Sequence, residues 1–471
     1  MADFIREAHK RGIKVCLDLV AGHSSNQCEW FRKSAREGKF GQYSGYYIWT
    51  DSISEHEKEE IRLRHASGHP ERDGRGRFVE ANAKSGRYYQ KNFFESQPAL
   101  NYGYAIPDPE CPWQQSMDAP GPRAVQQEML NIMAFWFSLG IDGFRVDMAH
   151  SLVKDDFEEQ ATVKLWTRMS RWVKEHYPDC VLISEWSNAP HAIPAGFDID
   201  FYMPWGNNGY GDLFMRSAKP GPEDNRAGGY FDRGGKGKIA HYVTDMERDM
   251  ALSRIYGSYL GMPTANHDFA RLSNNQRSGV EDLKVAMTFI MMQPGIPFVY
   301  YGDELGMRYI DGLPSVEGSN ERSGTRTPMQ WNCSPTAGFS TAQPEKLYLP
   351  VFTENGRITV ETEEKDAGSL LNFVKRLIAL RKSTPALNAK GNWEYVGDRE
   401  KPYPMVFKRS RANEEYIVVI NPSDGKVEAS IPHQGRTAIE VLRTGTAKYV
   451  SNQHADRLSL GSVSAAVYKI N

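Results

Sequence analysis

Residues 140–147 read GIDGFRVD, and this stretch carries the prediction of the fold. Its apolar part has the length of a strand, and it ends in Arg145 and Asp147. Similar short apolar runs stand at VCLDLV (15–20), CVLIS (180–184) and IPFVYY (296–301). Near-continuous apolar runs of this length are typical of strands that are buried on both faces of a parallel sheet. The stretch therefore predicts an α/β protein.

Longer amphipathic segments separate these runs, as expected when helices cover a parallel sheet. The sequence predicts strands at residues 14–19, 141–147, 181–185, 198–202, 263–266 and 296–301. It predicts helices at residues 3–10, 123–139, 156–176, 238–255, 280–292 and 369–382.

Two regions interrupt this alternation. Residues 24–121 are polar and rich in loop-forming residues, which predicts a sub-domain inserted after the strand at 14–19. Its charged stretch, residues 55–64, is expected to be a solvent-exposed helix face. Residues 388–471 alternate at period two in the segments WEYV, PMVFKR, YIVVIN, TAIEVL and AAVYKI, which predicts a C-terminal antiparallel β-sandwich domain.

The charge balance excludes one class of partner. The 471 residues contain 57 Lys and Arg against 59 Asp and Glu, a formal net charge of −2. Such a chain presents no basic field to a nucleic-acid backbone, so we expect no nucleic acid and an uncharged substrate.

The sequence also bears on where the protein is located and on whether it spans a membrane. The most apolar stretch, residues 285–301, is interrupted by polar residues, glycine and proline, so we expect no membrane span. The five cysteines form no CxxC pair, which suggests neither a zinc site nor a disulfide framework. The N-terminus lacks the pattern of a secretory signal, so we expect a cytoplasmic protein.

Charged and polar residues gather at the predicted strand ends. In a parallel sheet or barrel such residues face one common mouth, so groups far apart in sequence can meet there. Three carboxylates, an arginine and two histidines in one pocket suit glycoside hydrolysis, in which one carboxylate attacks the anomeric carbon and a second protonates the leaving oxygen. The three carboxylates are Asp147, Glu185 and Asp268, the arginine is Arg145, and the histidines are His23 and His267; Asp18 also lies at a predicted strand end.

These segments resemble the α-amylase family of glycoside hydrolases, family 13. The resemblance consists of the family's four characteristic segments in their usual order, with three supporting motifs, and it covers essentially the whole chain. The segments are DLVAGH (18–23), GFRVD (143–147), ISEW around Glu185 and NHD (266–268), and the motifs are QPALN (97–101), GIPFVYYGDELGM (295–307) and RTPMQW (326–331).

The resemblance implies a (β/α)8 TIM barrel formed by residues 1–23 and 122–387, with residues 24–121 as the inserted domain B. It makes Asp147 the nucleophile, Glu185 the general acid/base and Asp268 the carboxylate that stabilises the transition state. Arg145 would keep Asp147 ionised, and a neighbouring carboxylate would keep Glu185 protonated.

The resemblance also implies residues that bind the sugar: His23, His267 and Arg326. Because RTPMQW is shared by α-glucosidases, oligo-1,6-glucosidases and trehalose synthases, exo-action on short oligosaccharides is favoured over endo-attack on an α-glucan such as starch. We therefore expect a retaining α-glucosidase or oligo-1,6-glucosidase.

Departures from the family pattern leave several properties open. Gly22 stands where calcium-dependent amylases commonly have Asn, so we expect no cofactor and no calcium at that position. Ala99 and Met148 replace residues that are diagnostic of linkage, so the linkage specificity stays open, as does the oligomeric state. Two strand–helix units of the family have no counterpart before residues 3–10, so we expect a fragment, a mis-assigned start or an incomplete barrel, and a chain with little activity.

Alternative interpretations remain. A trehalose synthase-like or transglycosylating enzyme would use the same three carboxylates, and only product analysis separates it from a hydrolase. A non-catalytic descendant would keep the fold for binding or assembly, but it would have no reason to retain Asp147, Glu185 and Asp268. Asp18 is expected to be mainly structural, and His150 to be a surface or satisfied histidine with no site nearby.

Overall fold

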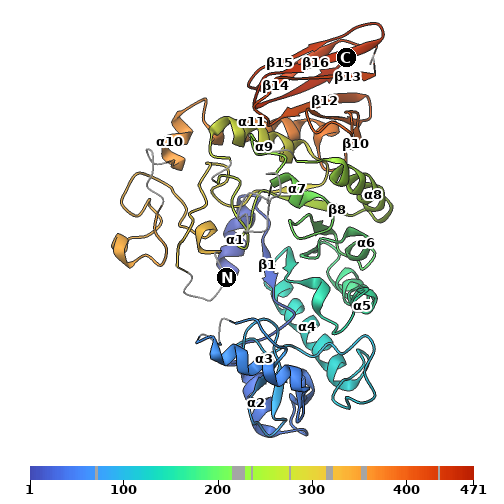
Figure 1. Ribbon diagram of the computed structural model, residues 1–471, viewed down its shortest axis with the longest axis vertical. Coiled ribbons are helices and arrows are strands. Elements are labelled where there is room, and N and C mark those ends of the chain that lie inside the picture. The colour runs from blue at the N-terminus through green and yellow to red at the C-terminus, as the bar shows by residue number, and fades with distance from the viewer. Residues whose placement is uncertain are drawn as a thin grey trace. The chain divides into compact units, whose positions relative to one another are not determined.

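The computed structural model describes residues 1–68, 70, 73–214, 229–234, 237–274, 277–314, 322–351, 358–432 and 435–471. The chain divides into two compact units, which are described separately below (Figure 1). The first unit consists of Met1–Phe201 with Tyr256–Ser258, and the second of Tyr202–Ile255 with Tyr259–Asn471.

A parallel sheet forms the centre of the first unit. Its strands follow the order β1 (Cys16–Leu19), β5 (Gly143–Val146), β6 (Val181–Ser184) and β7 (Ile199–Phe201). The four strands that the sequence predicts for this part of the chain are thus confirmed. Their burial differs from the prediction, because Cys16 and Asp18 of β1 are exposed. Among the described strands β1 pairs with β5 alone, so one edge of β1 has no strand beside it.

Helices α1 (Ala2–Lys10), α4 (Pro120–Ser138) and α5 (Gln160–His176) pack on this sheet in one hydrophobic core. In α4, Val125, Met129, Met133 and Phe137 recur every four residues and are buried. This spacing places them on one face of the helix, as the amphipathic pattern predicts. The short helix α6 (Ala189–Ala192) follows β6.

The inserted region forms a small layer of its own. It contains α2 (Glu29–Glu37), α3 (Glu55–Ala66) and an antiparallel sheet in the order β2 (Trp49–Thr50), β4 (Tyr88–Gln90), β3 (Phe78–Glu80). The side chain of Ser54 caps α3 by accepting the N–H of Glu57 at 3.2 Å.

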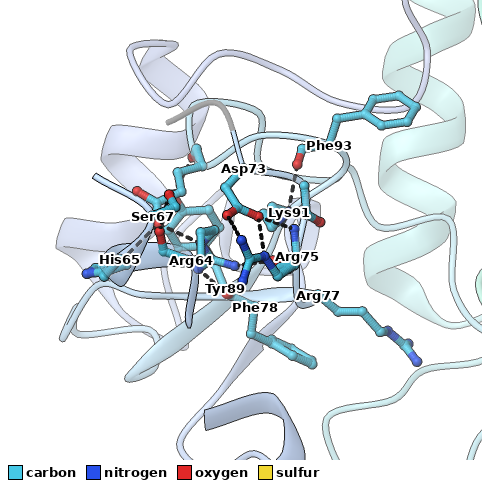
Figure 2. Close-up of polar contacts among 12 residues, drawn as sticks. Arg64, His65, Ser67, Asp73, Arg75, Arg77, Phe78, Tyr89, Lys91 and Phe93 are labelled. Carbon is cyan, nitrogen blue, oxygen red and sulfur yellow. Dashed lines mark hydrogen bonds and ion pairs between the residues drawn. The ribbon is translucent and has the colours of Figure 1, made fainter. Parts of the chain in front are cut away.

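The prediction that residues 55–64 form a solvent-exposed helix face is wrong at Ile61 and Arg64, which are buried. Arg64 is fully buried; its Nε lies 2.9 Å from Glu95 Oε1. Its other nitrogens donate to the carbonyls of Arg75 and Phe78 (Figure 2). The guanidinium is buried because its planar fork satisfies several loop acceptors at once.

Two parallel strands, β8 (Tyr259–Pro263) and β9 (Ile296–Phe298), lie in the second unit. The helices of this unit are α7 (Tyr210–Phe214), α8 (Ala240–Tyr256), α9 (Val280–Met292), α10 (Val360–Lys365) and α11 (Leu370–Ser383). The strand predicted at 263–266 is wrong in position, since β8 ends at Pro263. It ends there because Asn266 Oδ1 accepts the N–H groups of Asp268 and Phe269, which turns the chain out of the strand.

The C-terminal strands form two antiparallel sheets (red in Figure 1). The first has the order β10 (Asn392–Tyr395), β11 (Met405–Arg411), β12 (Glu414–Asn421), β17 (Ser464–Ile470), β14 (Ala438–Thr444). The second has the order β13 (Val427–Pro432), β16 (Ala455–Leu460), β15 (Ala447–Val450). One apolar core joins the two sheets, as in the predicted sandwich. The helices of the described residues include none with the length and apolar character that a bilayer requires.

Candidate active site

Sheet register brings the predicted residues of the first unit together. Asp18 of β1 lies opposite Arg145 of β5. Asp147 and Glu185 each follow the last residue of a strand, and their N–H groups donate at 3.0 Å to the carbonyls of Leu19 and Val146. All four side chains therefore stand at the carboxyl ends of parallel strands, where active sites of such sheets are found.

The guanidinium of Arg145 links three carboxylates. Its Nη1 lies 2.7 Å from Asp18 Oδ1 and 2.8 Å from Asp147 Oδ1, and its Nη2 lies 2.6 Å from Glu185 Oε2. Burial alone would lower the pKa of Arg145, but the charges of Glu185, Asp18 and Asp147 outweigh it and raise the pKa above the ordinary value. The predicted contact of Arg145 with Asp147 is thus present, while those with Asp18 and Glu185 were not predicted.

Two donors bind Oε2 of Glu185. Besides the contact with Arg145, this oxygen accepts the N–H of Met148 at 3.1 Å. Met148 has a φ of 42°, a left-handed conformation that is unfavourable for a residue with a side chain. The second nitrogen of the Arg145 guanidinium reaches Glu185 while the first binds Asp147. That a neighbouring carboxylate keeps Glu185 protonated stays a prediction.

His23 joins this site through the inserted region. It pairs with Ala99 of the QPALN motif, and Asn92 Nδ2 lies 3.1 Å from its Nδ1. Burial lowers the pKa of His23; the charge of Asp147 opposes this effect, and that of Lys154 adds to it. A neutral ring that accepts the amide of Asn92 at Nδ1 carries its hydrogen on Nε2, which makes Nε2 a donor.

A cavity of about 480 Å³ adjoins these residues within the first unit. Asn92 and Met148 line it together with Lys91 and Lys154. Burial lowers the pKa of each lysine to about 8. The ammonium of Lys91 donates to the carbonyls of Gly74 and Phe93, the latter bond being drawn in Figure 2, and that of Lys154 donates to the carbonyl of Ser151.

The residues around Gly22 do not suit calcium. Gly22 offers no side-chain oxygen, and the positive charge of Lys154 is close enough to affect the neighbouring His23. Calcium requires several oxygen ligands, and a nearby ammonium opposes its binding. In the part of the chain that the structure describes, His, Cys, Asp and Glu form no group of three or more that could hold a metal ion.

A larger cavity, of about 770 Å³, lies within the inserted region, where Trp49, Asn101 and Trp113 are among its lining residues. None of the residues predicted for catalysis or sugar binding lines it. These residues do not line the smaller cavity either, but two residues that do, Asn92 and Met148, contact His23 and Glu185.

The second unit brings together the remaining predicted residues. Arg326 Nη2 lies 3.3 Å from Asp268 Oδ1, and its Nε donates to the carbonyl of His267 at 2.8 Å. His267 Nε2 lies 3.4 Å from Asp268 Oδ2. Arg322 Nη1 also binds Asp268 Oδ1, at 3.0 Å. Two guanidinium groups thus bind the same oxygen of Asp268.

Sequence reasoning missed one residue at these sites. Arg322 stands four residues before Arg326, and a second cation so close to RTPMQW could have indicated it. His150 was expected to be a surface or satisfied histidine. It is partly buried beside the backbone of Glu185, and burial lowers its pKa.

The chain is similar to a known protein family and to several of its members. A family model described as the catalytic domain of alpha amylase matches residues 1–390. The trehalose synthase/amylase TreS of Mycolicibacterium smegmatis is 30% identical over 434 residues, which cover 83% of this chain and 64% of that protein. The oligo-1,6-glucosidase of Parageobacillus thermoglucosidasius is 26% identical over 486 residues, which cover 90% of this chain and 78% of that protein. The chain therefore spans about two thirds of the length of its trehalose synthase relative.

Solved structures show the same fold. The trehalulose synthase MutB from Pseudomonas mesoacidophila MX-45 has a TM-score of 0.78 and 22% identity, and the match covers all of this chain and 85% of that one. With the parallel strands of both units and the C-terminal antiparallel sheets, this likeness assigns the chain to the (β/α)8-barrel fold that the sequence predicts.

Proposed function

Because the chain belongs to the α-amylase family of glycoside hydrolases, we propose that it is a retaining glycosidase that cleaves α-glucosidic bonds of oligosaccharides. The observation that carries this proposal is the contact of Arg145 with both Asp147 and Glu185. A retaining mechanism needs two carboxyl groups side by side, one as nucleophile and one as acid and base.

In the first step, the carboxylate of Asp147 attacks the anomeric carbon. The bond to the leaving oxygen breaks, and Glu185 gives this oxygen its proton. Arg145 holds the nucleophile in place through its contact with Asp147 Oδ1, and His23 donates from Nε2 to a sugar hydroxyl. Asp268 stabilises the positive charge that develops on the sugar ring, and His267 and Arg326 bind its hydroxyls.

In the second step, Glu185 takes a proton from water, which attacks the glycosyl-enzyme and restores the α-configuration. Protonation of Glu185 requires that its ion pair with Arg145 be given up, because a neutral carboxyl does not form it. Arg145 then retains its contacts with Asp147 and Asp18.

The configuration of the first product tests this function. Hydrolysis of p-nitrophenyl α-glucoside, followed by NMR from the first turnover, should release α-glucose, and Asp147→Asn should abolish the signal. An initial β-product would exclude the retaining mechanism. No turnover on this glucoside, maltose or isomaltose would favour a non-catalytic protein.

The likeness to trehalose synthases supports a second candidate, in which the glycosyl group is returned to a sugar instead of water. Maltose distinguishes the two activities. A hydrolase releases glucose as the main product, whereas an isomerising enzyme forms trehalose and little free glucose.

A further inference from the structure

A carboxylate outside the residues discussed so far gathers the chain that follows Glu185. Glu159 Oε2 accepts the indole N–H of Trp186 at 2.7 Å and the amide of Asn188 at 3.0 Å. His191 Nδ1 lies 2.7 Å from the same oxygen. Since an ionised carboxylate can only accept, this ring nitrogen carries the hydrogen. One oxygen thus binds three side chains of the segment 186–191.

Glu159 stands at the start of α5, in a left-handed conformation with a φ of 58°. Such a conformation is costly for glutamate and persists where the surrounding structure requires it. Glu159 is held in this conformation because its side chain accepts three hydrogen bonds, at least two of them from neutral donors. Glu159 is therefore fixed by the same contacts by which it holds the segment.

The sheet also fixes this segment. The N–H of Glu185 donates to the carbonyl of Val146 at 3.0 Å. Asp200 Oδ1 accepts the hydroxyl of Ser184 at 2.7 Å and the N–H of Ser187 at 3.1 Å. Ser187 itself has a φ of 61°. The main chain that leaves β6 at Ser184 is thus held by both Asp200 and Glu159.

We propose that Glu159 is a positioning residue for the acid/base carboxyl of Glu185, an inference that rests on the function proposed above. Glu159 acts through Trp186, the residue next to Glu185, whose side chain is buried. Without the hydrogen bonds to Glu159, the turn after Glu185 can shift, and the carboxyl of Glu185 moves relative to the leaving oxygen. A displacement of about 1 Å in a reacting group can cost about a hundredfold in rate.

Leaving-group dependence separates this role from a general structural one. A misplaced acid harms substrates that need a proton on the leaving oxygen and spares those that do not. In Glu159→Gln, kcat/KM should fall at least about tenfold on phenyl α-glucoside and less than about twofold on 2,4-dinitrophenyl α-glucoside. Glu158→Gln is the matched control, since Glu158 is the exposed neighbour and should leave both values unchanged.

A second measurement detects the hydrogen bond between Trp186 and Glu159 directly. The indole N–H of Trp186, assigned in NMR spectra by its loss in Trp186→Phe, should shift in Glu159→Gln and not in Glu158→Gln. Should Glu159→Gln not fold, Trp186→Phe removes one of the hydrogen bonds and should show the same leaving-group dependence with a smaller amplitude.

An equal loss on both substrates, with the wild type active, would overturn the positioning role and leave the proposed function intact. An unshifted indole resonance would show that the hydrogen bond between Trp186 and Glu159 is absent. A wild-type protein without turnover on either glucoside would overturn the proposed function, and the positioning role with it.

Discussion

Arg145 Nη2 lies 2.6 Å from Glu185 Oε2. The same guanidinium binds Asp147, so a single cation is shared by the two carboxylates to which the mechanism gives opposite tasks. Asp147 keeps its contact with Arg145 throughout the reaction. Glu185 must give up its contact with Arg145 before it can carry a proton. The fork of Arg145 thus fixes the positions of the two carboxylates relative to each other.

The first prediction concerns this fork. Arg145→Lys keeps the positive charge but cannot bridge two carboxylates in a fixed geometry. We expect kcat/KM on p-nitrophenyl α-glucoside to fall by about a hundredfold or more, because both reacting groups lose their common support. Arg168→Lys on α5, a surface ion-pair partner of Asp118, is the control and should stay near wild type. An unchanged kcat/KM in Arg145→Lys would show that the fork is dispensable.

The roles of the two carboxylates can be assigned with azide. In Glu185→Ala, azide should restore turnover and give α-glucosyl azide, because it attacks a covalent intermediate from the face that water normally uses. In Asp147→Ala, azide replaces the nucleophile and should give the β-azide. The reverse pattern would exchange the two assignments.

A stability prediction concerns Arg409, which is fully buried. It donates to the carbonyls of Met292 at the end of α9 and of Asn388 and Asn392. Arg409→Met removes these three hydrogen bonds, and of the three carbonyls that of Asn388 keeps the N–H of Gly391 as a donor. The loss should cost about 3 kcal/mol or more of unfolding free energy. The urea denaturation midpoint measures the loss. Arg376→Met, at an exposed position on α11, should change it by less than about 0.5 kcal/mol.

The raised pKa of Asp303 makes the stability of the protein depend on pH. Burial raises its pKa to about 6 from 3.8, although Arg271 and Thr264 oppose this effect. The folded state therefore binds the proton more tightly than the unfolded state. The contribution of Asp303 to stability is present below about pH 4 and is lost as the pH rises to about 6.

Asp303→Asn should remove this dependence. The stability of the wild type relative to the variant should fall by about 2–3 kcal/mol between pH 4 and pH 6. Urea denaturation of both proteins at pH 4, 5, 6 and 7 provides the comparison. A difference that stays level or rises with pH would contradict the raised pKa.

The sequence predicts the strands and helices that have a strong apolar period. The helix at Val280–Met292 and the strands ending at Arg145–Asp147 and Glu185 are found as expected, because burial and local propensity agree there. The strands at 427–432, 447–450 and 455–460 were missed, since polar residues interrupt their apolar positions and tertiary pairing decides them. The family prediction is confirmed, while the domain boundaries and the roles of the site residues stay predictions.

Contacts between side chains were less accessible to sequence reasoning. Motif order identifies Arg145, Asp147 and Glu185, but not that one guanidinium binds both carboxylates, because this depends on register and rotamer. Likewise, Glu159 lies 27 residues before Trp186, and no local pattern relates them. Buried charges such as Arg64 are mispredicted for the same reason, since only the fold supplies their partners.

The proposed mechanism requires that Asp147 form a covalent bond with the sugar. Incubation with 5-fluoro-α-glucosyl fluoride slows the release of the glycosyl group, so the intermediate can be digested and its attachment site read by mass spectrometry. We expect a single 5-fluoroglucosyl adduct on Asp147, absent in Asp147→Asn. An adduct on another carboxylate, or a protein that turns over the reagent with no adduct while releasing an inverted product, would contradict this mechanism.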